Sequence, residues 1–323
     1  MEPVSTTEQE KWLMIVNPKA QSGALETQWP AIAEQMSLRN FACDVVITRY
    51  RFHAVELVFS AVRQGYRRFI AVGGDGTISE VVNGMFMQRE VSVDSLTLGV
   101  IPAGSGNDWS RMFGLSKDYS TLFQAFEDGH TIWQDVGVVQ VQECGVQKKV
   151  YVVNGVGIGL DAEIARRCNQ LKAKGRKGHF IYLWAGLLSL FGRRTRQASV
   201  WVDDQLFFQG SILSLAMGIG RYTGGGMLQT PEASPDDGLL DVTLIKKASV
   251  LRILKEFPKL YSGAIYQIKD KVRWVRGTTV RVECLPSSRV EADGELIGYT
   301  QLEFSLLPSA LRICVPLTED RHL

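Results

Sequence analysis

A glycine-rich turn between an apolar run and a helical pattern constrains this chain more than any other feature. Residues 68–72 have the pattern of a buried strand, and they lead directly into Gly73-Gly74-Asp75-Gly76-Thr77. Apolar residues then recur at helical spacing, at Ile78, Val81, Val82 and Met85. Bare backbone N–H groups at a helix start attract anions, so the pattern predicts a phosphate-binding turn. The alternative is a tight turn in which Asp75 or Thr77 only caps the helix.

A second glycine-rich turn follows the next apolar run. Residues 98–101 read as another buried strand, and the segment after them contains Gly104, Ser105, Gly106, Asn107 and Asp108 before an aromatic helical pattern begins. Turns after successive strands of one sheet meet in one crevice. Asn107 and Asp108 either contact a ligand there or cap the helix that starts near Trp109.

The pattern of predicted helices and strands changes near residue 133. Strand and helix patterns alternate before that point, which predicts an open, mostly parallel α/β sheet. Short strand-like runs dominate after it, which predicts an all-β second domain. A chain of 323 residues is long enough for two such domains.

Composition excludes several classes of function. The formal net charge of +2 gives no reason to expect nucleic-acid binding. The polar first eleven residues do not resemble a secretory signal, and no apolar run reaches the roughly 18 residues that a spanning helix needs. We therefore expect a cytoplasmic protein that contacts membranes, if at all, from one side. The histidines form no spaced cluster that would suggest a zinc site or a catalytic triad.

One segment has an interfacial character. Residues 166–197 contain basic residues on both sides of an aromatic and aliphatic centre, with no acidic residue between them. Such a segment either lies at an anionic membrane surface or packs as an amphipathic helix with a solvated basic rim.

The motifs together resemble the diacylglycerol kinases of bacteria and their sphingosine and ceramide kinase relatives. The resemblance rests on residues 17–18, 22–23, 73–77, 102–108, 154–161, 235–239 and 293–295, which occur in the family's order over nearly the whole chain. It implies an α/β nucleotide-binding domain similar to that of NAD kinases, formed by residues 1–134 with 309–323 returning to it. It also implies a β-sandwich lipid-substrate domain over 135–308, with a basic helical insertion at 163–197.

The resemblance implies ATP and Mg²⁺ as cofactors. The nucleotide-binding residues that it implies are Asn17, Pro18, Ser22, Gly23, Thr48, Gly73, Gly74, Asp75, Gly76, Thr77, Ser79, Gly104, Ser105, Gly106 and Asn107. No lysine of the P-loop type follows the glycines, so metal and backbone dipoles must compensate the phosphate charge. Asp75 is suited to reach that Mg²⁺, because hard cations prefer carboxylate oxygens.

The resemblance also implies catalytic and structural carboxylates. Glu295 is the expected general base, Asp75 shares or replaces that role, and Asp135 supports the site. A structural Mg²⁺ is implied at the carboxylate of Asp237 and the main-chain carbonyls of Ser234 and Leu239. The alternatives from the residues alone are a solvated hairpin glutamate for Glu295, a structural turn for Asp135 and a hairpin turn without metal for residues 236–238.

The expected activity is transfer of the γ-phosphoryl group of ATP to the hydroxyl of a diacylglycerol-like lipid, which yields phosphatidic acid. Three alternatives stay open: a sphingoid, ceramide or other lipid kinase, an NAD kinase, and a catalytically silent lipid-binding regulator. We expect a lipid substrate at an anionic membrane surface on the inner face of the membrane, no nucleic acid, and a homodimer as one candidate assembly.

Overall fold

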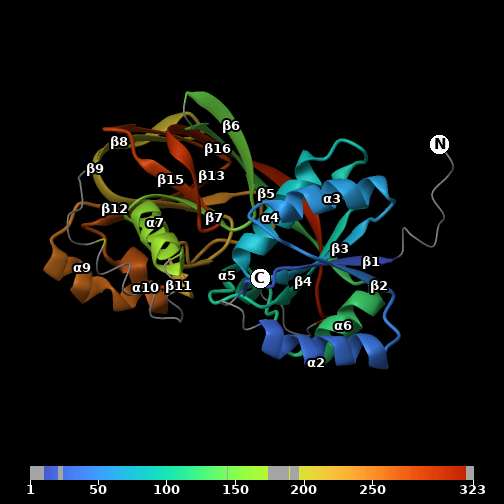
Figure 1. The fold of residues 1–323 in the computed structure, drawn as a ribbon. Helices are drawn as coiled ribbons and strands as arrows, with labels where there is room; N and C mark the ends of the chain where they lie inside the picture. The colour runs from blue at the N-terminus through green and yellow to red at the C-terminus, as the bar shows by residue number, and fades with distance from the viewer. Residues whose placement is uncertain (1–10, 21–24, 144, 174–188, 190–195, 318–323) are drawn as a thin grey trace. The chain divides into compact units, whose positions relative to one another are not determined.

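The computed structural model describes residues 11–20, 25–143, 145–173, 189 and 196–317. The chain divides into two compact units, unit 1 with Met1–Gln134 and Ser309–Leu323, and unit 2 with Asp135–Pro308. Unit 1 is α/β and unit 2 is mainly β (Figure 1), which confirms the predicted fold class.

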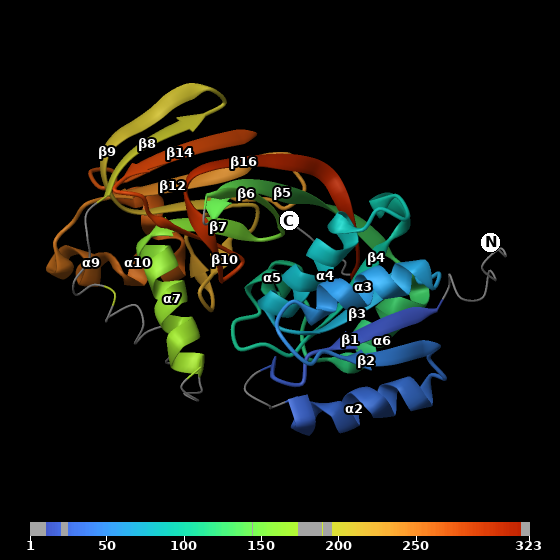
Figure 2. The same ribbon diagram turned by 45° about the horizontal axis from the view of Figure 1, so that its top comes forward.

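Unit 1 contains an open parallel sheet with the strand order β16-β4-β3-β1-β2. Its strands are β1 (Trp12–Val16), β2 (Cys43–Ile47), β3 (Arg68–Gly73), β4 (Thr97–Pro102) and the end of β16 (Glu295–Cys314). Its helices are α2 (Leu25–Leu38), α3 (His53–Arg63), α4 (Asp75–Met87), η2 (Val93–Ser95), α5 (Asp108–Met112) and α6 (Tyr119–Asp128). Helix α3 packs against α4, and α2 packs against α6 on the other face of the sheet (Figure 2).

The central strands of unit 1 are apolar because helices cover both faces of the sheet. All residues of β1 and β4 are buried, and so are Phe69, Ile70, Ala71 and Val72 of β3. Continuous apolar runs of this kind are typical of buried parallel strands, whereas one-sided sheets alternate apolar and polar residues.

The strand order of unit 1 reverses at β1. The chain places β2 on one side of β1 and β3 on the other, so the loops after β1 and β3 leave in opposite directions. In open α/β sheets, ligands bind outside the carboxyl ends of the strands at such a reversal. Asn17 follows β1 there, and the turn at Gly74 follows β3.

Unit 2 is built from antiparallel strands. They are β5 (Thr131–Glu143, which begins in unit 1), β6 (Val146–Val152), β7 (Gly155–Gly159), β8 (Arg196–Val202), β9 (Gln205–Gly218), β10 (Tyr222–Thr223), β11 (Met227–Leu228), β12 (Leu240–Lys246), β13 (Val272–Gly277), β14 (Thr279–Leu285), β15 (Arg289–Ala292) and most of β16. Its helices are α7 (Leu160–Ala173), α9 (Val250–Glu256), α10 (Pro258–Ser262) and η3 (Ala264–Gln267). One aliphatic core joins these strands, with Leu215, Leu244 and Val282 at 0% exposure.

The two glycine-rich turns of unit 1 are in direct backbone contact. A Cβ atom on Gly104 would lie 2.4 Å from Cα of Gly74 and 2.5 Å from Oδ1 of Asn107. A Cβ atom on Gly74 would lie 2.8 Å from Cα of Gly104. Both glycines are therefore required by the close approach of two backbones.

Gly104→Ala should lower the free energy of unfolding by about 2 kcal/mol, because the new methyl group overpacks a contact between two backbones. Gly76→Ala is the matched control in the neighbouring turn, since a Cβ atom there meets nothing within 4 Å. We expect Gly76→Ala to change stability by at most about 1 kcal/mol, towards stabilisation, because Gly76 lies in a helix. Denaturant titrations of both variants check this, and equal midpoints for the two would contradict it.

Candidate active site

The first predicted phosphate turn is held in place by the strand beside it. The Nδ2 group of Asn17, directly after β1, donates to Oγ1 of Thr77 at 3.0 Å, and Oδ1 of Asn17 accepts from the N–H of Lys19 at 3.0 Å. Gly74 is the residue before α4, and no side chain caps this helix. The first N–H groups of a helix have no partner inside it. The turn therefore presents backbone donors and the Thr77 hydroxyl at the start of α4.

Asp75 connects the two glycine-rich turns. Its Oδ1 atom accepts the N–H of Trp109 at 3.0 Å, so it caps the short helix α5 across the crevice and not its own helix α4. Its Oδ2 atom and Oδ2 of Asp108 both lie 3.3 Å from the point where a Cβ of Gly106 would be. Two carboxylates thus flank the second turn at Gly106.

Asn107 has a structural role in the second turn. It has a left-handed backbone conformation with φ 51°, and its Oδ1 atom accepts the N–H of Gly104 at 2.8 Å. The sequence offered capping of α5 or ligand contact for this side chain; the structure shows that it closes its own turn.

The other predicted nucleotide-binding residues lie on the same unit. Thr48 follows β2, and its N–H donates to the carbonyl of Val16 at 2.9 Å, which places it beside the end of β1. Pro18 follows Asn17, Ser105 lies in the second turn, and Ser79 lies one helical turn into α4. Ser22 and Gly23 lie outside the described residues. Their assignments as ligands of a nucleotide stay predictions.

The predicted catalytic turn of unit 2 is fixed by one carboxylate. Asp293 accepts the N–H groups of Val153, Asn154 and Gly155 at 3.0 to 3.1 Å. Its own backbone is left-handed with φ 47°. Glu295 then begins β16 as a half-buried residue, and Asn169 of α7 donates to its Oε2 atom at 3.4 Å. The turn is held by these hydrogen bonds, and the role of Glu295 as general base stays a prediction.

A second carboxyl lies under this turn. Oε2 of Glu291 accepts the N–H of Gly294 at 2.9 Å, and Oε1 lies 2.5 Å from the point where a Cβ of Gly157 would be. Burial, with the nearby charge of Asp161 as the next cause, raises the pKa of Glu291 to about 8. Glu291 is therefore a protonated carboxyl at neutral pH. The sequence analysis did not identify Glu291 as a site residue. Its position between the apolar residues Val290 and Ala292 of a strand was the signal that could have indicated it.

Asp161 stands at the polar end of an apolar pocket within unit 2. The pocket has a volume of about 180 Å³ and is lined by α7, α9, α10 and neighbouring strands. Aliphatic and aromatic residues form most of its wall, among them Ile164, Leu213, Met227, Ile253, Phe257, Leu260, Ile265 and Val272. Ser214 donates to Oδ2 of Asp161, and Gln229 donates to its Oδ1 at 2.8 Å. Burial raises the pKa of Asp161, and its hydrogen bonds from Ser214 and Gln229 partly offset that rise.

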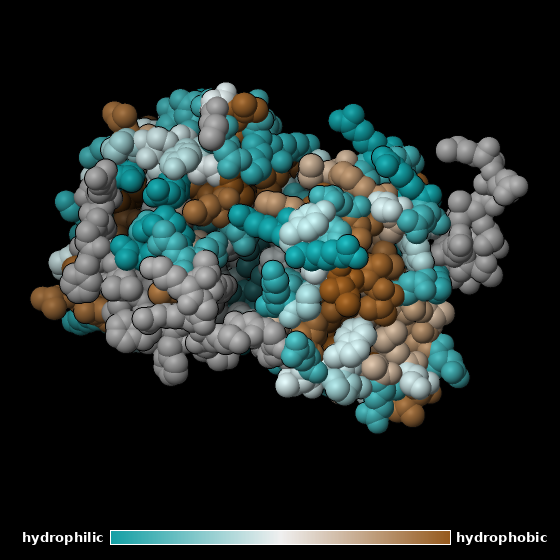
Figure 3. Space-filling view, in the orientation of Figure 1, coloured by the Kyte–Doolittle hydropathy of each residue, from teal (hydrophilic) through white to brown (hydrophobic). Residues whose placement is uncertain are grey.

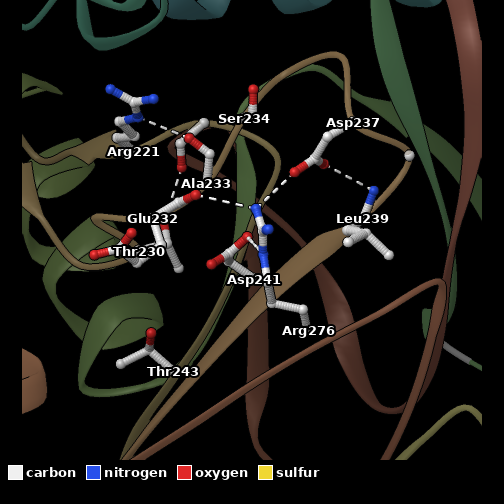
Figure 4. Close-up of polar contacts among 12 residues, drawn as sticks. Arg221, Thr230, Glu232, Ala233, Ser234, Asp237, Leu239, Asp241, Thr243 and Arg276 are labelled. Carbon is white, nitrogen blue, oxygen red and sulfur yellow. Dashed lines mark hydrogen bonds and ion pairs between the residues drawn. The ribbon is translucent and has the colours of Figure 1, made fainter. Parts of the chain in front are cut away.

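The residues of the implied structural Mg²⁺ site surround a guanidinium group (Figure 4). Nη2 of Arg276 lies 2.6 Å from Oδ2 of Asp237 and 3.0 Å from the carbonyl oxygen of Glu232, and Nε lies 3.0 Å from Oδ2 of Asp241. The other oxygen of Asp237 accepts the N–H of Leu239 at 3.0 Å.

Both oxygens of Asp237 accept hydrogen bonds in this arrangement, and its Oδ2 atom faces the guanidinium group of Arg276. Within the described part of the chain, no group of three His, Cys, Asp or Glu residues suits a metal. The implied ligands are of another kind, one carboxylate with the main-chain carbonyls of Ser234 and Leu239. The ligand set Ser234, Asp237 and Leu239 stays a prediction of the resemblance, while the observed cation is Arg276.

Asp135 holds the loop that carries these residues. It is buried, its Oδ2 atom accepts the N–H of Gly238 at 2.6 Å, and its N–H donates to the carbonyl of Pro235 at 2.7 Å. Asp135 therefore supports this turn, and its expected role in support of the active site stays a prediction.

The basic segment is described only in part. Arg166 and Arg167 of α7 pair with Glu163 at 2.6 and 3.0 Å, an acid just outside the interval that the sequence analysis considered. The apolar centre of the segment lies outside the described residues. Among the residues with described positions, no helix is long and apolar enough to cross a membrane.

Comparisons with known proteins agree with this geometry. Residues 11–139 match the diacylglycerol kinase catalytic domain, and residues 154–315 match the YegS C-terminal NAD kinase beta sandwich-like domain. A diacylglycerol kinase of Mycobacterium tuberculosis is 31% identical over 307 residues, which cover 94% of this chain and 94% of the relative.

Solved structures show the same fold. A diacylglycerol kinase from Bacillus anthracis aligns with a TM-score of 0.68 at 21% identity, over 95% of this chain and 97% of that chain. An NAD kinase from Archaeoglobus fulgidus in complex with ATP aligns with a TM-score of 0.50 at 12% identity, over 94% of both chains. The glycine-turn sheet and the β unit thus define a protein with the fold that diacylglycerol kinases and NAD kinases share. The chain belongs to the diacylglycerol kinase family, as its motifs indicated.

Glu291→Gln should change how stability depends on pH. Between about pH 4.5 and 8 the Glu291 carboxyl is protonated in the folded protein and ionised in the unfolded chain. The folded state then binds more protons, so this contribution to stability is fully present below pH 4.5 and is lost as the pH rises to about 8. The glutamine keeps an acceptor for Gly294 but does not titrate. Denaturant midpoints measured from pH 5 to 8 should therefore fall less steeply for the variant, and parallel curves would refute the assignment.

Arg276→Met should destabilise unit 2 by about 3–5 kcal/mol, because it leaves a buried carboxylate without its cation. The side chain of Asp241 is 0% exposed. Adding Asp241→Leu to this variant should restore part of the lost stability, because the buried carboxylate that had no cation is then also removed. Arg273→Met on the same strand is the control, because the described residues give Arg273 no ion pair. Thermal unfolding compares the variants, and equal losses for Arg276→Met and Arg273→Met would exclude this role.

Proposed function

We propose that this protein is an ATP-dependent lipid kinase that transfers the γ-phosphoryl group to the hydroxyl of a diacylglycerol-like lipid, giving phosphatidic acid. The observation that carries the proposal is the apolar pocket of unit 2 with Asp161 at its polar end. An acyl chain is the kind of ligand that an aliphatic and aromatic wall favours, whereas a dinucleotide needs polar and cationic partners along its length.

Unit 1 supplies the nucleotide end of the reaction. The backbone N–H groups of Gly74, Asp75 and Gly76 and the Thr77 hydroxyl bind phosphate oxygens at the start of α4, where the helix dipole favours negative charge. Asn17 keeps the Thr77 hydroxyl oriented by donating to its oxygen, which leaves the hydroxyl hydrogen for a phosphate. The NAD kinase relative bound to ATP has the same fold and supports ATP as donor.

A catalytic Mg²⁺ fits the acidic pair of unit 1. Mg²⁺ is usually held by one or two carboxylates together with substrate phosphates, and Asp75 with neighbouring Asp108 offers such a pair beside Gly106. Bound there, it would neutralise charge that develops on the transferring phosphoryl group.

Unit 2 supplies the lipid end. The acyl chains enter the apolar pocket, and the Asp161 carboxyl with Ser214 and Gln229 hydrogen-bonds the polar backbone of the lipid. Glu295 accepts the proton of the attacking hydroxyl. Asp293 fixes the turn that carries Glu295, and the amide of Asn169 orients its carboxylate.

Glu295→Gln should lower kcat by at least about a hundredfold, because general-base catalysis typically contributes 10²–10⁴-fold. Affinity for a non-hydrolysable ATP analogue should change by less than about threefold, since the nucleotide binds unit 1. Glu303→Gln, an exposed glutamate on the same strand, is the control.

Both variants are compared with wild type by transfer of radiolabelled phosphate to diacylglycerol, ceramide, sphingosine and NAD. Transfer to NAD in preference to every lipid would refute the proposed function. A kcat of Glu295→Gln within a few fold of wild type would exclude Glu295 as the base and leave Asp75 in that role. Vesicle binding without any transfer would identify a silent lipid-binding protein.

A further inference from the structure

Helix α9 of unit 2 has apolar residues on two opposite sides. Ile253 and Phe257 line the apolar pocket, while Leu251 is 80% exposed and makes no part of its wall. On α10, Leu260 lines the pocket and Tyr261 is 50% exposed. A helix that is apolar all round normally has apolar surroundings on all sides. Helix α9 therefore presents apolar side chains to the solvent as well as to the pocket, between charged residues.

The exposed residues form one surface, which we call the α9–α10 surface and define by Leu251, Leu254 and Tyr261. Figure 3 shows hydrophobic side chains on the outer edge of the molecule at the position of α9. The helices that carry them are well defined: Ser249 caps α9 by accepting the N–H of Arg252 at 3.3 Å, and Pro258 is the first residue of α10. The exposed side chains therefore lie on or directly beside well-formed helices.

The chain around this surface is strongly basic. Residues 246–271 contain seven basic residues, Lys246, Lys247, Arg252, Lys255, Lys259, Lys269 and Lys271, and two acidic ones, Glu256 and Asp270. Both acids are already paired, Glu256 with Arg252 and Lys259, and Asp270 with Arg252. No ion pair among the described residues involves Lys247, Lys255 or Lys269. Their charges are left for an anionic partner.

The pocket wall reaches this surface at Leu254. This side chain lines the pocket and is also 44% exposed. A lipid that left a membrane here would pass along one side chain from the outside to the inside of unit 2.

We propose that the α9–α10 surface docks on an anionic lipid bilayer, with Leu251, Leu254 and Tyr261 entering the headgroup region and the lysines contacting anionic headgroups. The inference rests on the proposed function, because it explains how a bilayer lipid reaches the pocket. The α9–α10 surface would bind membranes in addition to the basic segment at 166–197, for which the sequence analysis considered this role. The combination of apolar side chains and unpaired lysines favours a bilayer over a protein partner, since interfacial helices carry this pattern.

Flotation with vesicles, in the absence of ATP, tests the proposal. Wild type should bind vesicles that contain phosphatidylglycerol more tightly than vesicles of phosphatidylcholine alone. Lys255→Glu should weaken binding to the anionic vesicles at least about fivefold, because a basic residue near the surface contributes about 1 kcal/mol, which is about a fivefold change in affinity. Leu251→Asn should weaken binding by a similar factor, since it removes an inserting apolar side chain.

Matched controls are available on the same protein. Leu285→Asn changes a leucine of unit 2 that is 77% exposed but lies on β14, and Lys117→Glu reverses an exposed lysine of unit 1. Neither should change vesicle binding by more than about twofold. All four variants should keep the wild-type melting temperature and the wild-type rate on a dispersed short-chain diacylglycerol, because none of these side chains lines the pocket or the proposed catalytic turn.

The outcomes separate this surface from the proposed function. If Lys255→Glu and Leu251→Asn bind anionic vesicles like the controls, or if wild type binds no vesicles, the docking surface is refuted and a protein partner becomes the better occupant. If vesicle binding falls as expected while wild type phosphorylates no lipid, the surface stands and the kinase proposal fails.

Discussion

The contact between the backbones of Gly74 and Gly104 is the constraint on which the site of unit 1 depends. Side chains at either position would separate the two turns, and Asp75 could then no longer reach the N–H of Trp109. That single bond ties the start of α4 to the start of α5. The bare glycines, the carboxylate and the helix start are therefore one arrangement, and the proposed phosphate and Mg²⁺ sites both depend on the same close approach.

Four carboxyl groups of unit 2 differ in their partners. Asp293 is buried and accepts three backbone N–H groups, and buried Asp241 pairs with Arg276. Glu291 and Asp161 have no ion pair within the described residues. The pKa of each is raised, because desolvation of a carboxylate without a nearby cation disfavours its charged form.

Much of this fold could be read from the sequence, because its strongest signals are local. The apolar run before Gly73 and the helical spacing after Thr77 each define an element without knowledge of the rest of the chain. Contacts between distant residues could not be read. Arg276 lies 39 positions from Asp237, and nothing in either segment indicates the pairing.

The positive charge that Arg276 places beside the loop is covalently attached to the chain. A guanidinium attached to β13 cannot dissociate, exchange for calcium or manganese, or be withdrawn by a chelator, whereas a bound ion can. The loop from Glu232 to Leu239 keeps its shape through this tethered charge. The hydrogen bonds that Arg276 makes to this loop therefore do not depend on the concentration of free Mg²⁺.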